Sequence, residues 1–287
     1  MRTVEQITAA VTDHGEGPVW SPAWGGLRFV DMLAGDLLAL RPDGAVERRH
    51  VGRVAAFVRP RAHGGYVVAT EHGIELADDV DGAPARAVEV THAPGIRMNE
   101  GTAAPDGSLY VGTSAWDQTP GAAALYRVGA DLAVEPVLDG ITISNGLGFS
   151  PDGASAYYVD SPTGRLDLFD VVDGRLVDRR VLVDRRGADG ALDGELDGLV
   201  VDAQGTIWVA VYGAATVLRY APDGTLLERV VLPVPHVTAC TLGGPDLTDL
   251  FVTTSRGGLG AAAAPGAGAL FRVEVDVPGL PVLPFAG

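Results

Sequence analysis

Four side chains with oxygen donors occupy the same place in four related stretches of the chain. Each is followed within two residues by a glycine and lies five positions before a residue pair that introduces a turn. These side chains are Glu16, Asn99, Asn145 and Asp197. Carboxylate and amide oxygens without His or Cys suit a hard divalent cation, and Zn²⁺ also accepts carboxylates. The pattern therefore predicts one divalent metal ion (Ca²⁺, Mn²⁺, Mg²⁺ or Zn²⁺) held by these four ligands.

Two interpretations of these residues compete. An Asn or Asp next to a glycine commonly forms a turn, and each of the four residues taken alone fits that description. The shared register favours a common site, because a repeat places all four at one depth around one axis. In the other two repeats, the position five residues before the turn is occupied by Val54 and, in a less regular copy, by Val237. Two buried carboxylates need a cationic partner, and the chain contains no lysine to supply it.

The elements that must position these residues form an internal repeat. A turn followed by a strand of alternating polar and apolar residues recurs six times, at a spacing of about 45 residues. The copies cover residues 24–31, 63–70, 105–113, 151–160, 202–210 and 245–254. Further alternating strands follow each copy and an inner strand precedes it, so each repeat is expected to hold four strands.

Four short antiparallel strands in a repeat of this length describe a propeller blade. The sequence therefore predicts an all-β fold, a six-bladed β-propeller with four-stranded antiparallel blades around a central metal-binding channel, as a single domain over residues 1–287. A β-sandwich is the alternative, and six in-phase copies of two elements disfavour it. Residues 2–11 are expected to add the outer strand of the last blade and so close the ring. The Gly- and Ala-rich stretch 257–269 is expected to be a loop between two strands of that blade.

Composition restricts the partners of the protein. The net charge is −16 at pH 7, and so acidic a chain is expected to bind neither nucleic acid nor an anionic membrane. The N-terminal stretch lacks the apolar region of a signal peptide, and no run approaches the ~20 apolar residues of a membrane helix. A cytoplasmic protein is the expectation. The single cysteine, Cys240, excludes an intrachain disulfide and is expected to be buried as a small apolar residue.

Several other residues that attract attention are expected to be structural. His14 is interpreted as a loop residue that forms hydrogen bonds, and Trp20, Trp24 and Trp208 as packing residues of the blades. Ser161 is not expected to be a nucleophile, because the chain has no G-x-S-x-G motif.

Six stretches of the sequence together resemble one known family. In chain order they are GEGPVW, RMNEG, ISNGLGFSPDG, YYVDSPTG, LDGLVVDAQGTIWVA and VTACTLGGPDLTDLFVTTSR. They resemble the gluconolactonase and regucalcin (senescence marker protein) family over nearly the whole chain. The resemblance implies a six-bladed propeller that binds one divalent cation in its channel and hydrolyses sugar lactones to aldonic acids. It also implies that the cation ligands fall on the four residues named above, that Arg97 contacts the substrate, and that Asp197 is the general base.

The chain departs from the family pattern beside the first asparagine ligand. Glu100 stands where the family usually has aspartate, and Ala104 replaces an aspartate often found five residues after that ligand. In place of an acidic loop residue that holds sugar hydroxyls in some members, the chain offers Trp116 and Asp117. The predicted substrate-binding residues are Arg97, Asn99, Glu100 and Trp116. An alternative interpretation places Arg97 at the rim, paired with Glu100.

The expected function is that of a divalent-metal-dependent hydrolase. It would open a small lactone, such as a sugar lactone or aldonolactone, to the hydroxy acid, with metal-activated water and Asp197 as general base. The expected partner is the small-molecule lactone alone, and the expected state is a monomer or weak homo-oligomer. Two alternatives are another ester hydrolase or specialised biosynthetic enzyme on the same scaffold, and a non-catalytic Ca²⁺-binding propeller.

Overall fold

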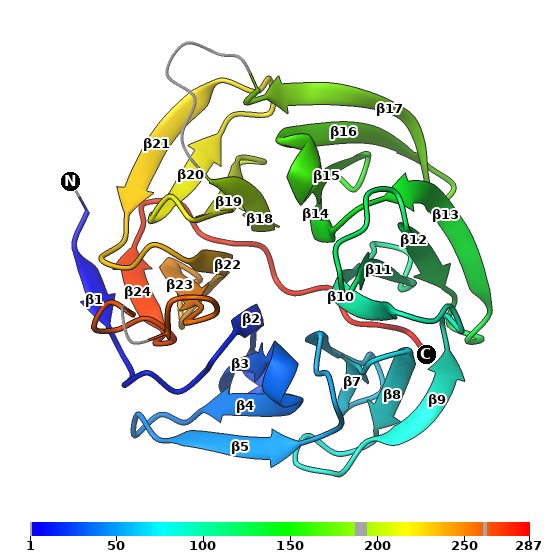
Figure 1. Ribbon diagram of the computed structural model, residues 1–287, viewed down its shortest axis with the longest axis horizontal. Coiled ribbons are helices and arrows are strands. Elements are labelled where there is room, and N and C mark those ends of the chain that lie inside the picture. The colour runs from blue at the N-terminus through cyan, green and yellow to red at the C-terminus, as the bar shows by residue number, and fades with distance from the viewer. Residues whose placement is uncertain (1, 187–193, 261–262) are drawn as a thin grey trace.

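Six four-stranded antiparallel sheets are arranged in a ring in the computed structural model (Figure 1). The structure describes residues 2–186, 194–260 and 263–287. Each sheet is one blade, and in five of the six its strands follow one another in the chain from the channel outward. The predicted six-bladed β-propeller is confirmed. No helix in the described ranges is long and apolar enough to cross a bilayer.

The strands of each blade run from the inner strand to the outer one. The first three blades are β2 (Gly15–Ser21), β3 (Gly26–Asp31), β4 (Asp36–Leu40) and β5 (Val46–His50); β6 (Phe57–Pro60), β7 (Tyr66–Ala69), β8 (Gly73–Ala77) and β9 (Ala85–Glu89); and β10 (Ile96–Ala103), β11 (Leu109–Ala115), β12 (Ala123–Val128) and β13 (Val134–Ile141). The next two are β14 (Ser144–Phe149), β15 (Ser155–Asp160), β16 (Arg165–Val172) and β17 (Arg175–Asp184); and β18 (Glu195–Val201), β19 (Ile207–Tyr212), β20 (Thr216–Tyr220) and β21 (Leu226–Val231). The sixth is β22 (Val237–Gly243), β23 (Asp249–Thr254), β24 (Phe271–Glu274) and β1 (Val4–Gln6). Short 3₁₀ turns at Pro22–Trp24, Met32–Ala34 and Ser161–Thr163 complete the described elements.

The N-terminal strand closes the ring, as predicted. β1 pairs antiparallel with β24, with Val4 opposite Val273, so the sixth blade is built from both ends of the chain (Figure 1). Arg2 adds an ion pair from this strand to Asp276 at 2.9 Å. The closure gives β24 an outer neighbour and leaves no gap in the ring. The stretch 257–269 does lie between β23 and β24, although its residues 261–262 are outside the described ranges.

Inner strands bulge just where the predicted cation ligands lie. The pairing register shifts between Glu16 and Val19 in β2, and comparable shifts occur in β10, β14, β18 and β22. The four ligand candidates therefore lie in bulged strands, and the interpretation as turn residues is wrong. The second blade breaks the symmetry, because Val54 precedes β6 and that strand pairs without a shift.

The glycines beside the ligand positions are required by close packing between blades. A Cβ added at Gly146 would lie 2.6 Å from the backbone nitrogen of Leu199, in the inner strand of the next blade. At Gly198 it would lie 2.5 Å from the Cβ of Ala239, again one blade further on. A side chain at either position would force neighbouring inner strands apart. Glycine thus sets the spacing of the strands that line the channel.

The C-terminal stretch 275–287 crosses the ring, which the sequence analysis did not anticipate (Figure 1). We call it the strap. Its backbone bonds to several blades: Pro278 O accepts from Ala203 N at 2.9 Å, and Phe285 N donates to Pro60 O at 2.8 Å. Phe285 is fully buried in the core beside the second and third blades. The strap therefore spans one end of the channel and ties the sixth blade to the opposite side of the ring.

Aromatic packing follows the prediction for Trp24 and Trp208, which are buried. The indole N–H of Trp208 donates to Asp202 Oδ2 at 3.0 Å, and Arg219 pairs with the same oxygen at 3.0 Å. Asp202 is fully buried, and its other oxygen accepts from two backbone N–H groups of its own turn. This carboxylate therefore fixes the turn, the second strand and the third strand of the fifth blade together.

Replacing Asp202 with alanine should lower the free energy of unfolding by about 3–5 kcal/mol, because Arg219 and Trp208 lose a buried acceptor. Chemical denaturation measures the change. Asp152→Ala removes an exposed aspartate from the corresponding turn of the preceding blade and should cost less than about 1 kcal/mol. Equal losses in the two variants would contradict the role given to the buried network.

Candidate cation and substrate site

The propeller brings the four predicted ligands to one level of the channel. Glu16 comes from β2, Asn99 from β10, Asn145 from β14 and Asp197 from β18, and all four are buried. Two of the four are in direct contact, since Asn99 Nδ2 donates to Asn145 Oδ1 at 3.1 Å. The charge of Glu16 also acts on Asp197 across the channel. The convergence expected from the repeat register is therefore present.

The two carboxylates of this level are poorly satisfied by the protein alone. Burial, followed by the charge of Glu100, raises the pKa of Glu16 to about 8. Burial, followed by the charge of Glu16, raises the pKa of Asp197 well above its ordinary value. Asp197 Oδ1 is buried and has no hydrogen-bond partner. Buried, mutually repelling carboxylates with an unpartnered oxygen are what a bound cation would satisfy, so these residues fit a divalent ion.

The donor set is one that hard cations prefer. Its members are two carboxylates and two amides, and in the described ranges no three His, Cys, Asp or Glu side chains cluster as a metal site. A cation here would therefore depend on amide oxygens as well as on carboxylates, which is typical of Ca²⁺ and less so of Zn²⁺.

Hydrogen bonds orient both amides. Asn99 Nδ2 also donates to Ser144 O at 2.8 Å, and Asn145 Nδ2 donates to Ser161 Oγ at 2.7 Å. Ser161 Oγ in turn donates to Leu196 O at 2.6 Å, next to Asp197. Ser161 therefore orients one ligand candidate and touches the strand of another. The absence of a G-x-S-x-G motif does not predict this role; the signal in the sequence is the place of Ser161 in the DSPTG stretch, directly after a strand.

Arg97 lies directly beside this level. Its guanidinium donates to Asn99 Oδ1 at 2.6 Å and to Met98 O at 3.0 Å, while Nε is buried without a partner. Burial lowers the pKa of Arg97 to about 10, and the charge of Glu16 opposes that effect. The alternative in which Arg97 pairs with Glu100 is wrong, because the partner of Glu100 is Arg59 at 3.1 Å.

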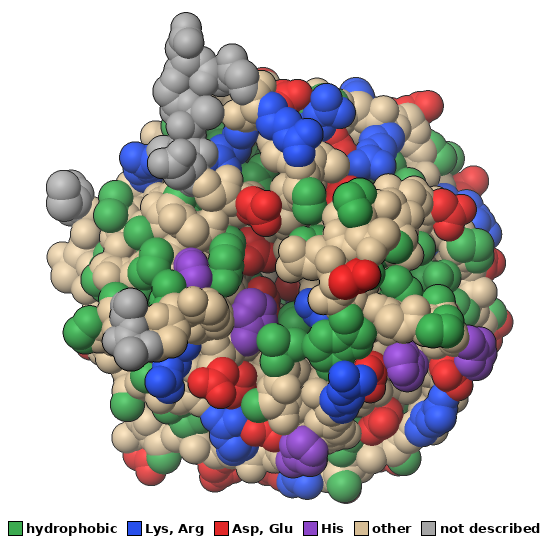
Figure 2. Space-filling view, in the orientation of Figure 1, with side chains coloured by type: hydrophobic (Ala, Val, Ile, Leu, Met, Phe, Trp, Pro, Cys, Tyr) green, Lys and Arg blue, Asp and Glu red, His purple; other side chains and the backbone are tan. Residues whose placement is uncertain are grey.

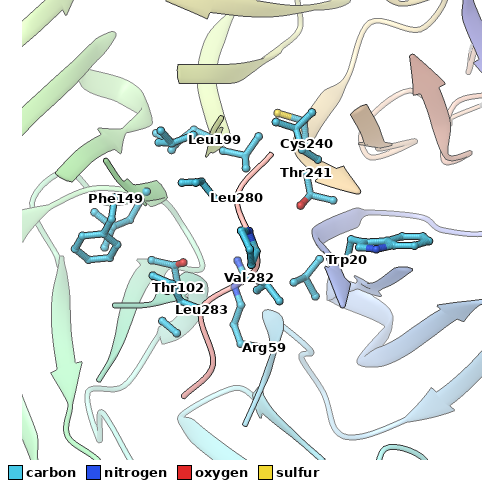
Figure 3. Close-up of a pocket in the computed structure, with 18 of the residues that line it drawn as sticks. Trp20, Arg59, Thr102, Phe149, Leu199, Cys240, Thr241, Leu280, Val282 and Leu283 are labelled. Carbon is cyan, nitrogen blue, oxygen red and sulfur yellow. The ribbon is translucent and has the colours of Figure 1, made fainter. Parts of the chain in front are cut away.

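Glu100 points away from Arg97. Its Oε1 accepts from Gly101 N at 2.8 Å as well as from Arg59; Glu100 is buried and Arg59 is partly exposed. The two residues line a cavity of about 410 Å³ that the strap closes with Leu280 to Leu283 (Figure 3). The other lining residues follow the ligand candidates along the inner strands and are mostly apolar. Arg97 is not among the lining residues of this cavity, and substrate contact by Glu100 stays a prediction.

Trp116 lies at the rim, on the Arg97 side. Its ring lies between two guanidinium groups, with Arg97 at 5.4 Å and Arg53 at 4.6 Å from the ring centroid. Its indole N–H donates to Glu71 Oε1 at 3.3 Å, and Arg53 pairs with the same oxygen at 2.6 Å. Trp116 is 38% exposed, so part of the ring is free to contact a ligand.

One face of the ring has a central hollow. Acidic, histidine and arginine side chains gather around it, with an apolar group beside them (Figure 2). His14 forms the predicted hydrogen bond, from Nδ1 to Ser255 Oγ at 2.8 Å, but its Nε2 is directed at the channel, 4.0 Å from Glu16 Oε1. Burial lowers the pKa of His14 to about 4, so this imidazole is neutral at pH 7.

The fold and the site define a class of protein, a six-bladed propeller that gathers carboxylate and amide oxygens from its inner strands into the channel. Within that class, the chain belongs to the SMP-30/gluconolactonase/LRE-like family. The family model, described as an SMP-30/Gluconolactonase/LRE-like region, matches residues 14–256. The resemblance expected from the sequence motifs is confirmed.

Characterised relatives align over almost the full chain. A 6-deoxy-6-sulfogluconolactonase of Pseudomonas putida is 36% identical and covers 95% of both chains. Regucalcin of Danio rerio is 32% identical over 99% of this chain and 98% of its own. The crystal structure of a regucalcin from Agrobacterium tumefaciens strain C58, described as a calcium-binding protein, matches with a TM-score of 0.93 at 28% identity. That match covers 100% of this chain and 98% of the other.

The raised pKa of Glu16 predicts a pH dependence of stability in the absence of metal. The cation-free folded protein retains a proton that the unfolded chain loses near pH 4.5, so stability should fall as pH rises from about 4.5 to about 8. The slope contributed by one such group is at most about 1.4 kcal/mol per pH unit. Urea unfolding with a chelator should show a smaller slope for Glu16→Gln and an unchanged one for the exposed control Glu47→Gln. The same slope in Glu16→Gln and the unaltered protein would contradict this assignment.

Proposed function

We propose that the protein is a divalent-cation-dependent hydrolase that opens a sugar lactone to the corresponding hydroxy acid. The observation that carries the proposal is the convergence of Glu16, Asn99, Asn145 and Asp197, with Asp197 Oδ1 buried and unpartnered. Membership of the family and the sulfogluconolactonase relative support a lactone as substrate. The cation ligands in this proposal are those four residues.

The reaction joins water to the ester carbon. A bond forms between the water oxygen and the carbonyl carbon, the ring C–O bond breaks, and the released ring oxygen takes up a proton to become a hydroxyl. A divalent cation at these ligands supplies Lewis acidity for the ester carbonyl and lowers the pKa of nearby water. Asp197 accepts the proton that the attacking water loses.

Arg97 and its neighbours bind the substrate. Arg97 already donates to Asn99 Oδ1, and its remaining N–H groups are placed to donate to substrate oxygens and stabilise the developing oxyanion. Asn99 links Arg97 to the ligand level through that bond. Trp116 supplies a partly exposed aromatic wall against which one face of the lactone packs.

The polar character of the rim favours a sugar lactone over an aryl ester. Three polar residues precede the ligand candidates on the inner strands. Arg97 lies in β10, Glu195 is the first residue of β18, and His14 directly precedes β2. A substrate rich in hydroxyl groups would find donors and acceptors there, whereas an apolar ester would leave them unpaired.

A non-catalytic calcium-binding protein is the second candidate, favoured by the description of the Agrobacterium regucalcin. A lactone panel assayed with Mn²⁺, Zn²⁺, Mg²⁺ and Ca²⁺ separates the two functions. Tight Ca²⁺ binding without turnover of any ester would support the second candidate and contradict hydrolysis.

Replacing Asp197 with alanine should remove cation binding and lower kcat/KM for lactone hydrolysis by about 10²–10⁴-fold, because a ligand and the general base are lost together. Isothermal titration with Mn²⁺ and a pH-stat assay measure the two effects. Asp152→Ala, an exposed aspartate at a blade turn, is the control and should change neither. Lactone hydrolysis at the original rate in Asp197→Ala would contradict the mechanism.

A further inference from the structure

A second level of side chains lies two residues before the ligand level in each blade. Side chains alternate along a strand, so residues two apart point the same way. The residues two positions before the six register positions are His14, Gly52, Arg97, Ile143, Glu195 and Pro235. Contacts confirm the shared direction in two blades: Arg97 reaches Asn99 Oδ1 at 2.6 Å, and His14 Nε2 lies 4.0 Å from Glu16 Oε1. We call this set the mouth level.

His14 is held so that one ring nitrogen faces the channel. Ser255 Oγ engages Nδ1 at 2.8 Å, and the backbone of His14 forms an isolated bridge with Ser255. That anchor leaves Nε2 as the free nitrogen, and 4.0 Å to Glu16 is too long for a hydrogen bond. Arg97 donates to Asn99 Oδ1 at 2.6 Å and His14 Nε2 lies 4.0 Å from Glu16 Oε1, so both side chains border the ligand level. A ligand that Arg97 binds would therefore also be within reach of His14.

Glu195 completes the polar part of this level. It opens β18 opposite Tyr212, is exposed, and makes no ion pair within the described part of the chain. Asp197 follows two residues later in the same strand, so the Glu195 side chain is expected to leave β18 on the same side as Asp197. An exposed carboxylate is hydrated, so leaving it without an ion-pair partner has little effect on the stability of the fold. Its oxygens can accept hydrogen bonds from ligand hydroxyl groups.

The mouth level thus offers one charged donor, one imidazole nitrogen and one carboxylate acceptor. A polyhydroxylated ring can use all three, because each hydroxyl both donates and accepts. An unsubstituted ring of the same size has no group for His14 or Glu195. We propose that these two residues determine specificity by binding hydroxyl groups, and so select a polyhydroxylated lactone over an unsubstituted one. The inference rests on the proposed hydrolysis of a sugar lactone and adds two residues that would recognise its hydroxyl groups.

The first test compares two six-membered lactones, glucono-1,5-lactone and δ-valerolactone. The ratio of their kcat/KM values should fall about tenfold in His14→Ala and in Glu195→Ala, since each variant loses one hydrogen bond to the substrate. The ratio should fall less in His14→Gln and Glu195→Gln, because these variants keep a polar group. His63→Ala, at an exposed turn, is the matched control and should keep the ratio. An unchanged ratio in both alanine variants would overturn the inference.

The second test measures binding without turnover. Titration of the Mn²⁺-loaded protein with D-gluconate should show about tenfold weaker affinity in His14→Ala, while Mn²⁺ affinity stays within about twofold. Loss of Mn²⁺ binding in His14→Ala would make His14 a cation ligand and overturn its proposed role. If the unaltered protein hydrolyses no lactone, the proposed function fails, but gluconate binding still decides this inference: weaker binding supports it and unchanged binding overturns it.

Discussion

The site depends on electrostatic repulsion between two carboxylates that the fold forces together. Glu16 and Asp197 come from inner strands of the first and fifth blades and are both buried, and the charge of Glu16 raises the pKa of Asp197 further above the level set by burial. The amides of the same level form hydrogen bonds with the protein, whereas Asp197 Oδ1 has no hydrogen-bond partner. A divalent ion bound by both residues would neutralise the two charges, so we expect cation binding to stabilise the folded protein.

The ring architecture imposes this arrangement and holds it. Glycines at positions such as Gly146 and Gly198 let neighbouring inner strands approach closely, and bulges beside them turn the ligand side chains toward the axis. Pairing of β1 with β24 and the strap across the far end keep the blades from separating. The apolar cavity between the strap and the Arg59–Glu100 pair lies behind the ligand level.

Repetition explains what the sequence could and could not predict. Turn-and-strand copies in phase revealed the blades, the ring closure and the convergence of four oxygen donors, because each follows from a pattern that recurs. Features that occur once were missed: the strap, the partner of Glu100 and the orienting role of Ser161. The Arg59–Glu100 pair joins the second and third blades, and the sequence around either residue does not predict this contact. The sequence around His14 predicts a loop residue, and it does not predict that the second ring nitrogen lies 4.0 Å from Glu16 Oε1.

Anomalous diffraction from crystals grown with Mn²⁺ tests the account most directly. The account predicts one strong peak in the channel, about 2.0–2.6 Å from carboxylate oxygens of Glu16 and Asp197 and amide oxygens of Asn99 and Asn145. A channel without such a peak at saturating Mn²⁺, or a peak bound by other residues, would contradict it.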